Sequence, residues 1–367
     1  MSSHPRSGRQ APAAKVAGAR AASRKVLKVS SFLRVADAPD AKPIEWLWHG
    51  RIEASPGSVF LLAGIPGGGK TSTTLRLLAS LTTGAAWPDG TPNDNEPRSV
   101  VMIAHEDDPG AIRARLSDAG ADASRVFLWL KNKNGKRPRF PEDADELGEH
   151  LKRVGASVLI LDPVSAYVRT TGASDQIREK LGSVLDAARN NGAAVWLLAH
   201  PSKTSATGRA SGLYFASGSA ALPELARAAA VLGANPDDPT HPTKRVLAWA
   251  KTNNASRPGS LACEILAGSY GPSMSFTGPS ASTADQVANA GTGEDDAKSS
   301  ELDEARRFLR ALLAGRILSA NFVKRETGMA GLSWSTVRRA QIALEIRPRK
   351  IGTTWSWALP GQEETES

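Results

Sequence analysis

The segment GIPGGGKT at positions 64–71 has the residue types and spacing with the clearest chemistry, GxxxxGK[ST]. It follows the apolar run SVFLLAG and opens the helical run TSTTLRLLASL, which is the context that this motif requires. Glycines let successive backbone N–H groups point onto phosphate oxygens, while the lysine reaches the outer phosphates and the threonine hydroxyl binds Mg²⁺. The sequence therefore predicts a site for ATP and Mg²⁺. Its binding residues are expected to be Gly64, Pro66, Gly67, Gly68, Gly69, Lys70, Thr71 and Ser72.

Two further polar residues end apolar runs later in the chain. Asp162 ends SVLILD, and an aspartate in this position after such a loop is expected to hold Mg²⁺ together with Thr71. The alternative for Asp162 is a cap at the end of a buried strand. His200 ends AAVWLLAH and could hydrogen-bond the terminal phosphate and report its presence, with Lys203 nearby. A lone histidine at a strand end can also be structural, and spacing leaves both interpretations open.

Three consecutive acids, Glu106, Asp107 and Asp108, follow the run VVMIAH. They cannot all be buried without partners, and ligands bind at the carboxyl edge of strands in open α/β sheets. Glu106 is the candidate for orienting and polarising the water that attacks the phosphate. Asp107 or Asp108 could instead be the base. The acids could also cap the helix that begins near Pro109, a role that suits Asp108.

The elements that must position these residues alternate between short apolar runs and helical stretches. Runs as apolar as VVMIA and VLIL are covered on both faces, so the sequence predicts an α/β fold with a mostly parallel sheet. Hairpin-like loops separate the later strands, so the sheet should end in antiparallel strands. The expected strands are 58–64, 99–106, 126–130, 157–162, 193–200, 228–232, 244–251 and 261–266, and the expected helices are 71–83, 109–119, 142–154 and 174–190.

Charge divides the chain into parts. The net charge is +9, with eight Lys or Arg and no acid in residues 1–34, and eleven Lys or Arg against two acids in residues 306–350. Cationic ends on a near-neutral middle indicate that the ends bind a polyanion. The expected parts are a disordered basic arm at 1–35, a P-loop ATPase domain at 36–277, a flexible linker at 278–299, a small domain at 300–360 and an acidic tail at 361–367.

The small domain is predicted to be a winged helix-turn-helix, because three helical segments precede two strands around Gly352. Ser333 is the expected N-cap of the third helix. That helix could enter the major groove of duplex DNA while the wing holds phosphates, and a protein-binding winged helix is the alternative. The excess of cations favours DNA. The expected DNA contacts are Thr336, Arg338, Arg339 and Arg349.

The composition indicates in which cellular compartment the protein is expected. The one cysteine, Cys263, excludes a disulfide framework and fits a reducing cytoplasm. No run approaches the roughly 18 apolar residues that a membrane span needs, so we expect a cytoplasmic protein without a membrane partner.

The order of the motifs resembles that of the RepA-like hexameric replicative helicase ATPases of plasmids, phages and integrated elements. The motifs are GIPGGGKT, TGAAWPDG, VVMIAHEDDPGAIRARLSDAGAD, VLILDPVSAYV, AHPSK, GSAALPELARAAAVL and AKTNN, within residues 44–270. The resemblance implies a RecA-like core, to which a C-terminal winged helix is often appended. It implies that Lys70 and Thr71 bind phosphate and Mg²⁺, that Glu106 is the catalytic glutamate, and that Asp162 is the Walker B acid.

The same resemblance implies roles for three further residues. His200 is similar to the sensor that couples the terminal phosphate to the DNA-binding loops. Arg227 stands where the family places an arginine finger, which reaches into the site of a neighbouring subunit and requires an oligomer. Arg115 resembles an arginine near the adenine, although it could also be a surface residue of an amphipathic helix. The sequence departs from DnaB-type relatives, which carry a Lys-x-Arg pair on a late strand. It has Lys251-Thr252-Asn253 there instead, and Arg245 and Arg257 are the fallback arginines.

Rings of this family thread single-stranded DNA through a central pore. The loop between His200 and Gly218 is the candidate for that contact, because it carries Lys203, Arg209 and Tyr214 among glycines and serines. An ordinary surface loop is the alternative. The resulting interpretation is a homo-hexameric DNA helicase or translocase acting in plasmid, phage or mobile-element replication. A DNA-binding regulatory ATPase without unwinding activity is the second hypothesis.

Overall fold

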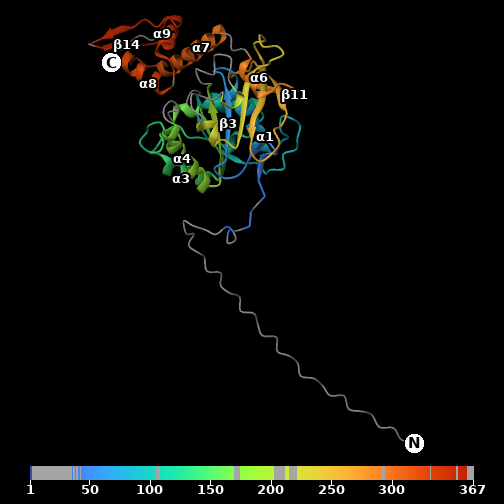
Figure 1. Cartoon of the computed structure of the whole chain (residues 1–367). Helices are drawn as coiled ribbons and strands as arrows, with labels where there is room; N and C mark the ends of the chain where they lie inside the picture. Colours follow the sequence, from blue (N-terminus) through green and yellow to red (C-terminus); the bar gives the residue numbers. More distant parts are fainter. Residues whose placement is uncertain are drawn as a thin grey trace. The chain divides into compact units, whose positions relative to one another are not determined.

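The computed structural model describes residues 43–104, 108–168, 174–201, 211–214, 221–290, 294–330, 332–352 and 354–361, together with positions 1, 35, 38, 40 and 41. By its contacts the chain divides into Met1–Pro43 and Ile44–Ser367. Every described helix and strand lies in the second unit (Figure 1). The basic arm expected at 1–35 lies almost entirely outside the described residues, so its disorder stays a prediction.

A nine-stranded sheet forms the centre of the second unit, in the order β11-β10-β9-β8-β3-β7-β6-β4-β5. The strands from β8 to β5 in this order pair in parallel, and those from β8 to β11 pair antiparallel. The predictions of a mostly parallel sheet and of antiparallel strands at its end are therefore confirmed. The strands are β3 (Val59–Gly64), β4 (Ser99–Ala104), β5 (Val126–Leu128), β6 (Ala156–Asp162), β7 (Ala194–Ala199), β8 (Ala228–Ala234), β9 (Lys244–Thr252), β10 (Ser260–Leu266) and β11 (Ser273–Ser280).

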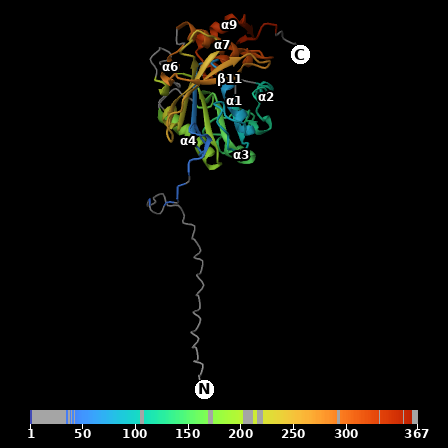
Figure 2. The same cartoon turned by 90° about the vertical axis from the view of Figure 1, so that its right-hand side faces the viewer.

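Helices cover both faces of this sheet (Figure 2). Phe60 and Leu62 of β3 pack with α1 (Lys70–Thr83) and α2 (Pro109–Asp118), while Leu61 of the same strand faces α3 (Ala144–Val154) and α4 (Ser174–Asn190). Strands buried on both faces have no polar alternation, which explains why the sequence shows them as continuous apolar runs. The shorter helices of this part are η2 (Ala123–Arg125), η3 (Val164–Ala166), η5 (Gly212–Tyr214), α5 (Ala221–Leu225) and α6 (Ala284–Asn289).

The prediction of a flexible linker at 278–299 is wrong for the residues of this segment that the structure describes. Positions 278–280 complete β11, α6 follows, and α7 (Glu294–Leu313) begins before the expected boundary. Thr283 and Gln286 form a capping box that starts α6, and Val287 is buried. A side chain at Gly233 of β8 would place its Cβ 2.6 Å from the Val287 carbonyl oxygen. Gly233 thus permits close packing of α6 on the sheet.

The C-terminal elements have a hydrophobic core of their own, which includes Leu309, Val323, Val337 and Trp357. The Ser333 side chain accepts a hydrogen bond from the Thr336 N–H and caps α9, as expected. A short strand that the sequence did not indicate, β12, pairs with β14 and gives a three-stranded sheet in the order β12-β14-β13. The elements are α7, β12 (Leu318–Ser319), α8 (Ala320–Met329), α9 (Trp334–Ala343), β13 (Arg349–Ile351) and β14 (Thr354–Trp357).

A small antiparallel pair, β1 (Trp46–Trp48) and β2 (Ile52–Glu53), precedes the central sheet. The Arg51 guanidinium between them lies over the rings of Trp48 and Trp249, 4.8 and 4.3 Å from their centroids. It also forms an ion pair with Asp89 at 3.1 Å. Cation–π contact and the ion pair together allow this arginine to be buried.

Among the helices that the structure describes, none combines the length and the apolar character needed to cross a bilayer.

Candidate nucleotide site

The loop from Gly64 to Lys70 joins β3 to α1 and has a backbone that only glycine adopts readily. Gly67 and Gly69 have φ angles of 69° and 96°, in the left-handed region. A side chain at Gly69 would also bring its Cβ within 2.6 Å of Met274 Cε. These glycines therefore leave the loop backbone bare at the N-terminus of α1, where N–H groups and the helix dipole favour an anion.

Lys70 is 6% exposed and folds over this loop. Its Nζ donates hydrogen bonds to the carbonyl oxygens of Gly64 at 2.8 Å and Ile65 at 3.0 Å. It also lies 3.1 Å from His200 Nδ1. An ammonium group has three N–H donors and no acceptor, so His200 Nδ1 must be the acceptor of this third bond. A phosphate that binds Lys70 must therefore share or replace at least one of these partners.

Thr71 and Asp162 meet beside Lys70. The Thr71 hydroxyl donates to Asp162 Oδ2 at 2.7 Å, and Asp162 is 8% exposed at the end of β6. One hydroxyl and one carboxylate are the hard oxygen donors that Mg²⁺ prefers, so the pair fits this ion. The described residues contain no group of three or more His, Cys, Asp or Glu that could hold a metal. A Mg²⁺ ion here would rely on phosphate and water for its other ligands, as it usually does.

His200 follows β7, the strand between β3 and β6. Burial and the positive charge of Lys70 hold the pKa of His200 well below its usual value of 6.5. The imidazole is therefore neutral at pH 7. Because Nδ1 accepts from Lys70, the proton of the neutral ring resides on Nε2. The ring can thus donate one hydrogen bond from Nε2 without carrying a charge.

Arg115 is buried beside the start of α1, at 9% exposure, so the alternative of a surface arginine is wrong. Its Nη2 donates to Ser72 Oγ at 3.0 Å, and Ser72 donates to the Pro272 carbonyl oxygen at 2.7 Å. Pro272 lies in the turn between β10 and β11, a connection that the sequence did not link to the loop. Tyr270 in the same turn is 61% exposed. The sequence feature that could have drawn attention to this turn is an aromatic residue between glycines, in GSYG.

Four further expected site residues contribute no described contact to this cluster, and three of them lie outside the described residues. Glu106, Lys203 and Arg209 lie outside the described residues, so their roles stay predictions. β4 does end beside β6, with Ala104 in register with Asp162, one residue before the undescribed segment 105–107. The fourth residue, Tyr214, is 52% exposed in η5.

Asp108 caps α2, which is the capping role expected for it. Its Oδ1 accepts from the N–H groups of Gly110 at 2.8 Å and Ala111 at 3.3 Å. A carboxylate at a helix N-terminus also interacts favourably with the helix dipole. The first turn of α2, and with it Arg115 further along the helix, is fixed in this way.

Arg227 is exposed and lies at the opposite edge of the sheet. Its N–H donates to the Val59 carbonyl oxygen at 2.8 Å, at the start of β3. Five residues of strand separate Val59 from Gly64, so at about 3.3 Å per residue the two edges lie roughly 16 Å apart. Lys251 lies in register with Ala229 on the neighbouring strand, and burial and the charge of Arg227 lower its pKa. Arg227 and Lys251 therefore lie near each other, and both are far from the loop.

The two fallback arginines differ from each other. Arg245 is partly buried on β9, and its guanidinium donates to the carbonyl oxygens of Pro242 at 2.9 Å and Lys244 at 2.8 Å. These bonds commit it to its own loop. Arg257 is exposed between β9 and β10.

One of the expected DNA contacts is wrong. Thr336 is 2% exposed, and its Oγ1 accepts from Arg339 Nη2 at 3.2 Å, so it faces the interior of the C-terminal elements. Thr336 and Val337 lie on the buried face of α9, whereas Arg338 and Arg339 lie on its exposed face. Arg338, Arg339 and Arg349 are exposed, as a contact with phosphate requires.

A family model described as an AAA domain matches residues 23–206, half of the chain. The match includes the loop from Gly64 to Thr71, Asp162 and His200, and it leaves residues 207–367 outside. No curated protein sequence matches the chain. The fold, the phosphate-binding loop and this match agree with one another: the chain belongs to the AAA domain family and is an ATPase of the P-loop type.

Proposed function

We propose that this ATPase is a ring-forming motor that moves along DNA, a helicase or translocase of the RepA-like type that serves plasmid, phage or mobile-element replication. One observation carries the proposal. Lys70, Thr71, Asp162 and His200 gather at one edge of the sheet, whereas Arg227 stands exposed at the other. An exposed arginine far from the loop of its own chain suits an assembly in which neighbouring copies complete each other's sites.

The position of Arg227 supports the proposed ring. Roughly 16 Å of strand is farther than an arginine side chain extends, so Arg227 cannot serve the loop of its own chain. In the site of a neighbour it would neutralise charge that develops on the transferred phosphate. Contacts of this kind repeat around a closed ring, and a homo-hexamer is the proposed assembly.

The loop N–H groups and Lys70 bind the triphosphate of ATP. Thr71 and Asp162 would hold Mg²⁺, which offsets the charge of the phosphates when it is bound. Glu106 is proposed to orient and polarise the attacking water, with Asp107 as the alternative base. His200 is proposed as the sensor, because its ring is neutral and its Nδ1 lies 3.1 Å from Nζ of Lys70, the residue proposed to bind the outer phosphates.

DNA is the proposed object of the motor. Lys203, Arg209 and Tyr214 follow His200 in sequence, so a change at His200 can reach them through few residues. The C-terminal elements are proposed to act as a winged helix on duplex DNA, with Arg338, Arg339 and Arg349 at phosphates. Trp355, 56% exposed on β14 and in register with Lys350, adds an aromatic surface to the proposed wing.

The test combines three measurements on the full chain: mass in solution with ATP, ATPase rate with and without single-stranded DNA, and unwinding of a forked duplex. The proposal expects a hexamer, a DNA-stimulated rate and strand separation. A monomer whose ATPase ignores DNA would overturn it. Glu106→Gln should retain ATP binding and abolish turnover, and persistent turnover would show that another residue is the base.

The second candidate is a regulatory ATPase that binds DNA and does not unwind it. The separate hydrophobic core of the C-terminal elements favours it, because such a module could bind duplex DNA without a ring. The forked-duplex assay separates the two candidates. DNA binding and ATP turnover without strand separation, together with full turnover by Arg227→Ala, would favour the regulatory protein.

A further inference from the structure

The outer edge of β5 is the free end of the central sheet opposite to β11. In the described part of the chain β5 pairs with β4 alone. The Trp129 N–H donates to the Met102 carbonyl oxygen of β4 at 3.0 Å. Because successive residues of a strand turn their backbone groups to opposite sides, the N–H and carbonyl of Leu128 point away from β4. An edge of this kind is a template for another extended chain.

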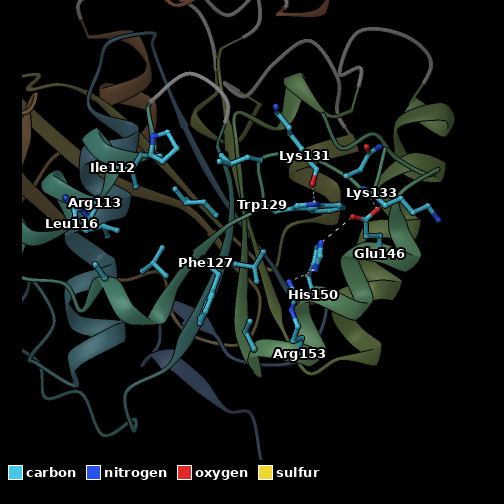
Figure 3. Close-up of a pocket in the computed structure, with 18 residues that line it drawn as sticks. Ile112, Arg113, Leu116, Phe127, Trp129, Lys131, Lys133, Glu146, His150 and Arg153 are labelled. Carbon is cyan, nitrogen blue, oxygen red and sulfur yellow. Dashed lines mark hydrogen bonds and ion pairs between the residues drawn. The ribbon is translucent and has the colours of Figure 1, made fainter. Parts of the chain in front are cut away.

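A cavity of about 730 Å³ runs along this edge between α2 and α3. Figure 3 shows β5 between two groups of lining residues, with Ile112 and Leu116 on one side and His150 and Arg153 on the other. Phe127 lines the cavity and is 39% exposed. Apolar lining beside an open strand edge favours an occupant that has both a backbone and side chains.

The two sides of the cavity differ in chemistry. On the α2 side Ile112 and Leu116 belong to the hydrophobic core that also contains the strands. On the α3 side His150 packs against Trp129, with ring centroids 4.9 Å apart, and Arg153 lies 3.0 Å from His150 Nδ1. Side chains of an added strand would alternate between these two sides. Apolar residues therefore suit one side and acidic residues the other.

The rim of the cavity, meaning its exposed charged lining residues, is mostly cationic. Arg113, Lys131, Lys133 and Arg153 line the cavity and are exposed, and no ion pair within the described residues engages them. The one acid among the described lining residues, Glu146, accepts from the Lys133 N–H at 3.1 Å and lies 3.5 Å from His150. The groove is thus locally positive on a near-neutral part of the chain, which attracts an acidic occupant.

We propose that this groove binds an extended segment of a partner protein, in which apolar and acidic residues alternate, as a further strand beside β5. Nucleic acid has no apolar side chains for Phe127 and Leu130, the lining residues that are 39% and 44% exposed, and it does not pair with strand amides. The N-terminal residues 1–34 of a second copy carry eight cations and no acid, so the rim would repel them. The proposal does not depend on the DNA motor.

The probe is an eight-residue peptide that alternates valine with aspartate and carries a fluorescein label. Its binding to the full chain is measured by fluorescence anisotropy against a peptide that alternates valine with lysine. We expect binding of the acidic probe at least about tenfold tighter than that of the basic one, because opposite charges on the rim attract and like charges repel. Equal affinity for the two peptides overturns the proposal.

Backbone pairing has its own test. Two versions of the acidic probe carry N-methyl groups, one on every valine and the other on every aspartate. In a strand only one of these sets of amides faces β5, so one version should lose binding by about tenfold or more and the other should retain it. Equal loss, or no loss in either version, overturns strand addition.

Variants locate the site. The double variant Lys131→Glu with Lys133→Glu should weaken the acidic probe by about tenfold, and Phe127→Ser should weaken it as well. Lys152→Glu is the matched control, because Lys152 is exposed on α3 and does not line the cavity. ATP turnover and thermal unfolding show that each variant is folded. Equal weakening by Lys152→Glu overturns the location.

Two competition experiments test the other possible occupants of the groove, single-stranded nucleic acid and a second copy of the chain. Displacement of the acidic probe by oligothymidylate, with sensitivity to the Lys131 and Lys133 changes, would overturn the proposal in favour of single-stranded nucleic acid. A second copy would occupy the groove more fully as the concentration of the protein rises. Loss of bound probe at high protein concentration would therefore overturn the proposal in favour of a second copy. Displacement by unlabelled acidic peptide alone supports it.

Discussion

The two edges of the central sheet place their charged residues in opposite ways. At the carboxyl edge of β3, Lys70 and Asp162 are 6% and 8% exposed and are engaged by neighbours within the chain. At the amino edge of the same strand, Arg227 is exposed, and the contact of its residue with β3 is a backbone hydrogen bond. The first arrangement suits side chains that hold a ligand in place, and the second suits a side chain that acts on another molecule.

This contrast has a physical cause. A buried charge is tolerated only with partners, so Lys70 and Asp162 are held in one geometry before a ligand arrives. An exposed arginine keeps its hydration and its rotamers until a partner orders it. One edge is therefore preorganised, and the role proposed for the other depends on assembly. Substitutions at each edge should separate binding from turnover.

The largest effect is expected from Arg227→Ala. If Arg227 completes the site of a neighbour, turnover of the assembled protein should fall by about a thousandfold, while ATP affinity stays the same. ATPase assays and equilibrium binding of a fluorescent ATP analogue measure the two quantities. Arg257→Ala, which removes an exposed arginine elsewhere, is the control and should have little effect.

Mixing variants sharpens this prediction. Subunits with Arg227→Ala keep an intact loop, and subunits with Lys70→Ala keep an intact Arg227. Neither is active alone, but a mixed ring contains interfaces that have both residues, so mixing should restore turnover. Failure to restore it would mean that Arg227 acts within its own chain or only in folding.

A smaller effect is expected at the buried edge from Asp162→Asn. The amide keeps the shape of the side chain but loses the charge that suits Mg²⁺, so turnover should fall by about a hundredfold and need more Mg²⁺. Mg²⁺ titration of the ATPase measures both changes. Asp175→Asn on α4 removes an exposed carboxylate and is the control. An unchanged Mg²⁺ requirement would contradict the assignment and favour a purely structural cap.

The residues of the buried edge were largely predictable from the sequence, and the contacts between them were not. Glycines, lysine and threonine in fixed spacing have one common structural solution, and Asp162 ends a strand whose apolar run gives its direction. The contact between Lys70 and His200 joins residues 130 positions apart, and only the order of β3 and β7 in the sheet brings it about. No local pattern specifies that order.

The misinterpretations have a related origin. Residues 278–299 have the composition of a linker, and the packing of Val287 against Gly233 that makes α6 a buried helix is a tertiary contact. Thr336 was expected to contact DNA together with Arg338 and Arg339 of the same helix, whereas it is 2% exposed and faces the interior. The groove beside β5 was invisible for the same reason, since its cations come from three separate segments.

A pH effect of intermediate size should come from His200. Its pKa in the folded protein lies well below 6.5, whereas the unfolded chain titrates near 6.5. Below pH 6.5 the unfolded state therefore binds more protons, and the free energy of unfolding should fall by up to about 1.4 kcal/mol per pH unit. The contribution of His200 is fully present above pH 6.5. Denaturant unfolding between pH 7 and pH 5, with His200→Gln as comparison, isolates it. Equal slopes for the two proteins would contradict a buried neutral ring.

The same residue reports on Lys70. Lys70→Met removes a positive charge that lowers the pKa of His200, so that pKa should rise while burial still holds it below 6.5. NMR titration of the histidine ring protons follows this change. A pKa that does not move would mean that the two side chains are not in contact in solution.

The smallest effect is expected from Lys251→Met, and it asks whether the exposed edge needs more than its arginine. Lys251 Nζ donates to the Pro223 carbonyl oxygen at 3.1 Å, so this lysine is bound within its own chain while Arg227 beside it is exposed. Loss of the bond should lower the free energy of unfolding by about 1 kcal/mol, and turnover should stay within about threefold of the unmodified protein. Denaturant unfolding and ATPase rates measure these values. A loss of turnover comparable to that of Arg227→Ala would instead assign both cations to the neighbouring site, because a lysine that only supports its own loop has no route to the chemistry of another subunit.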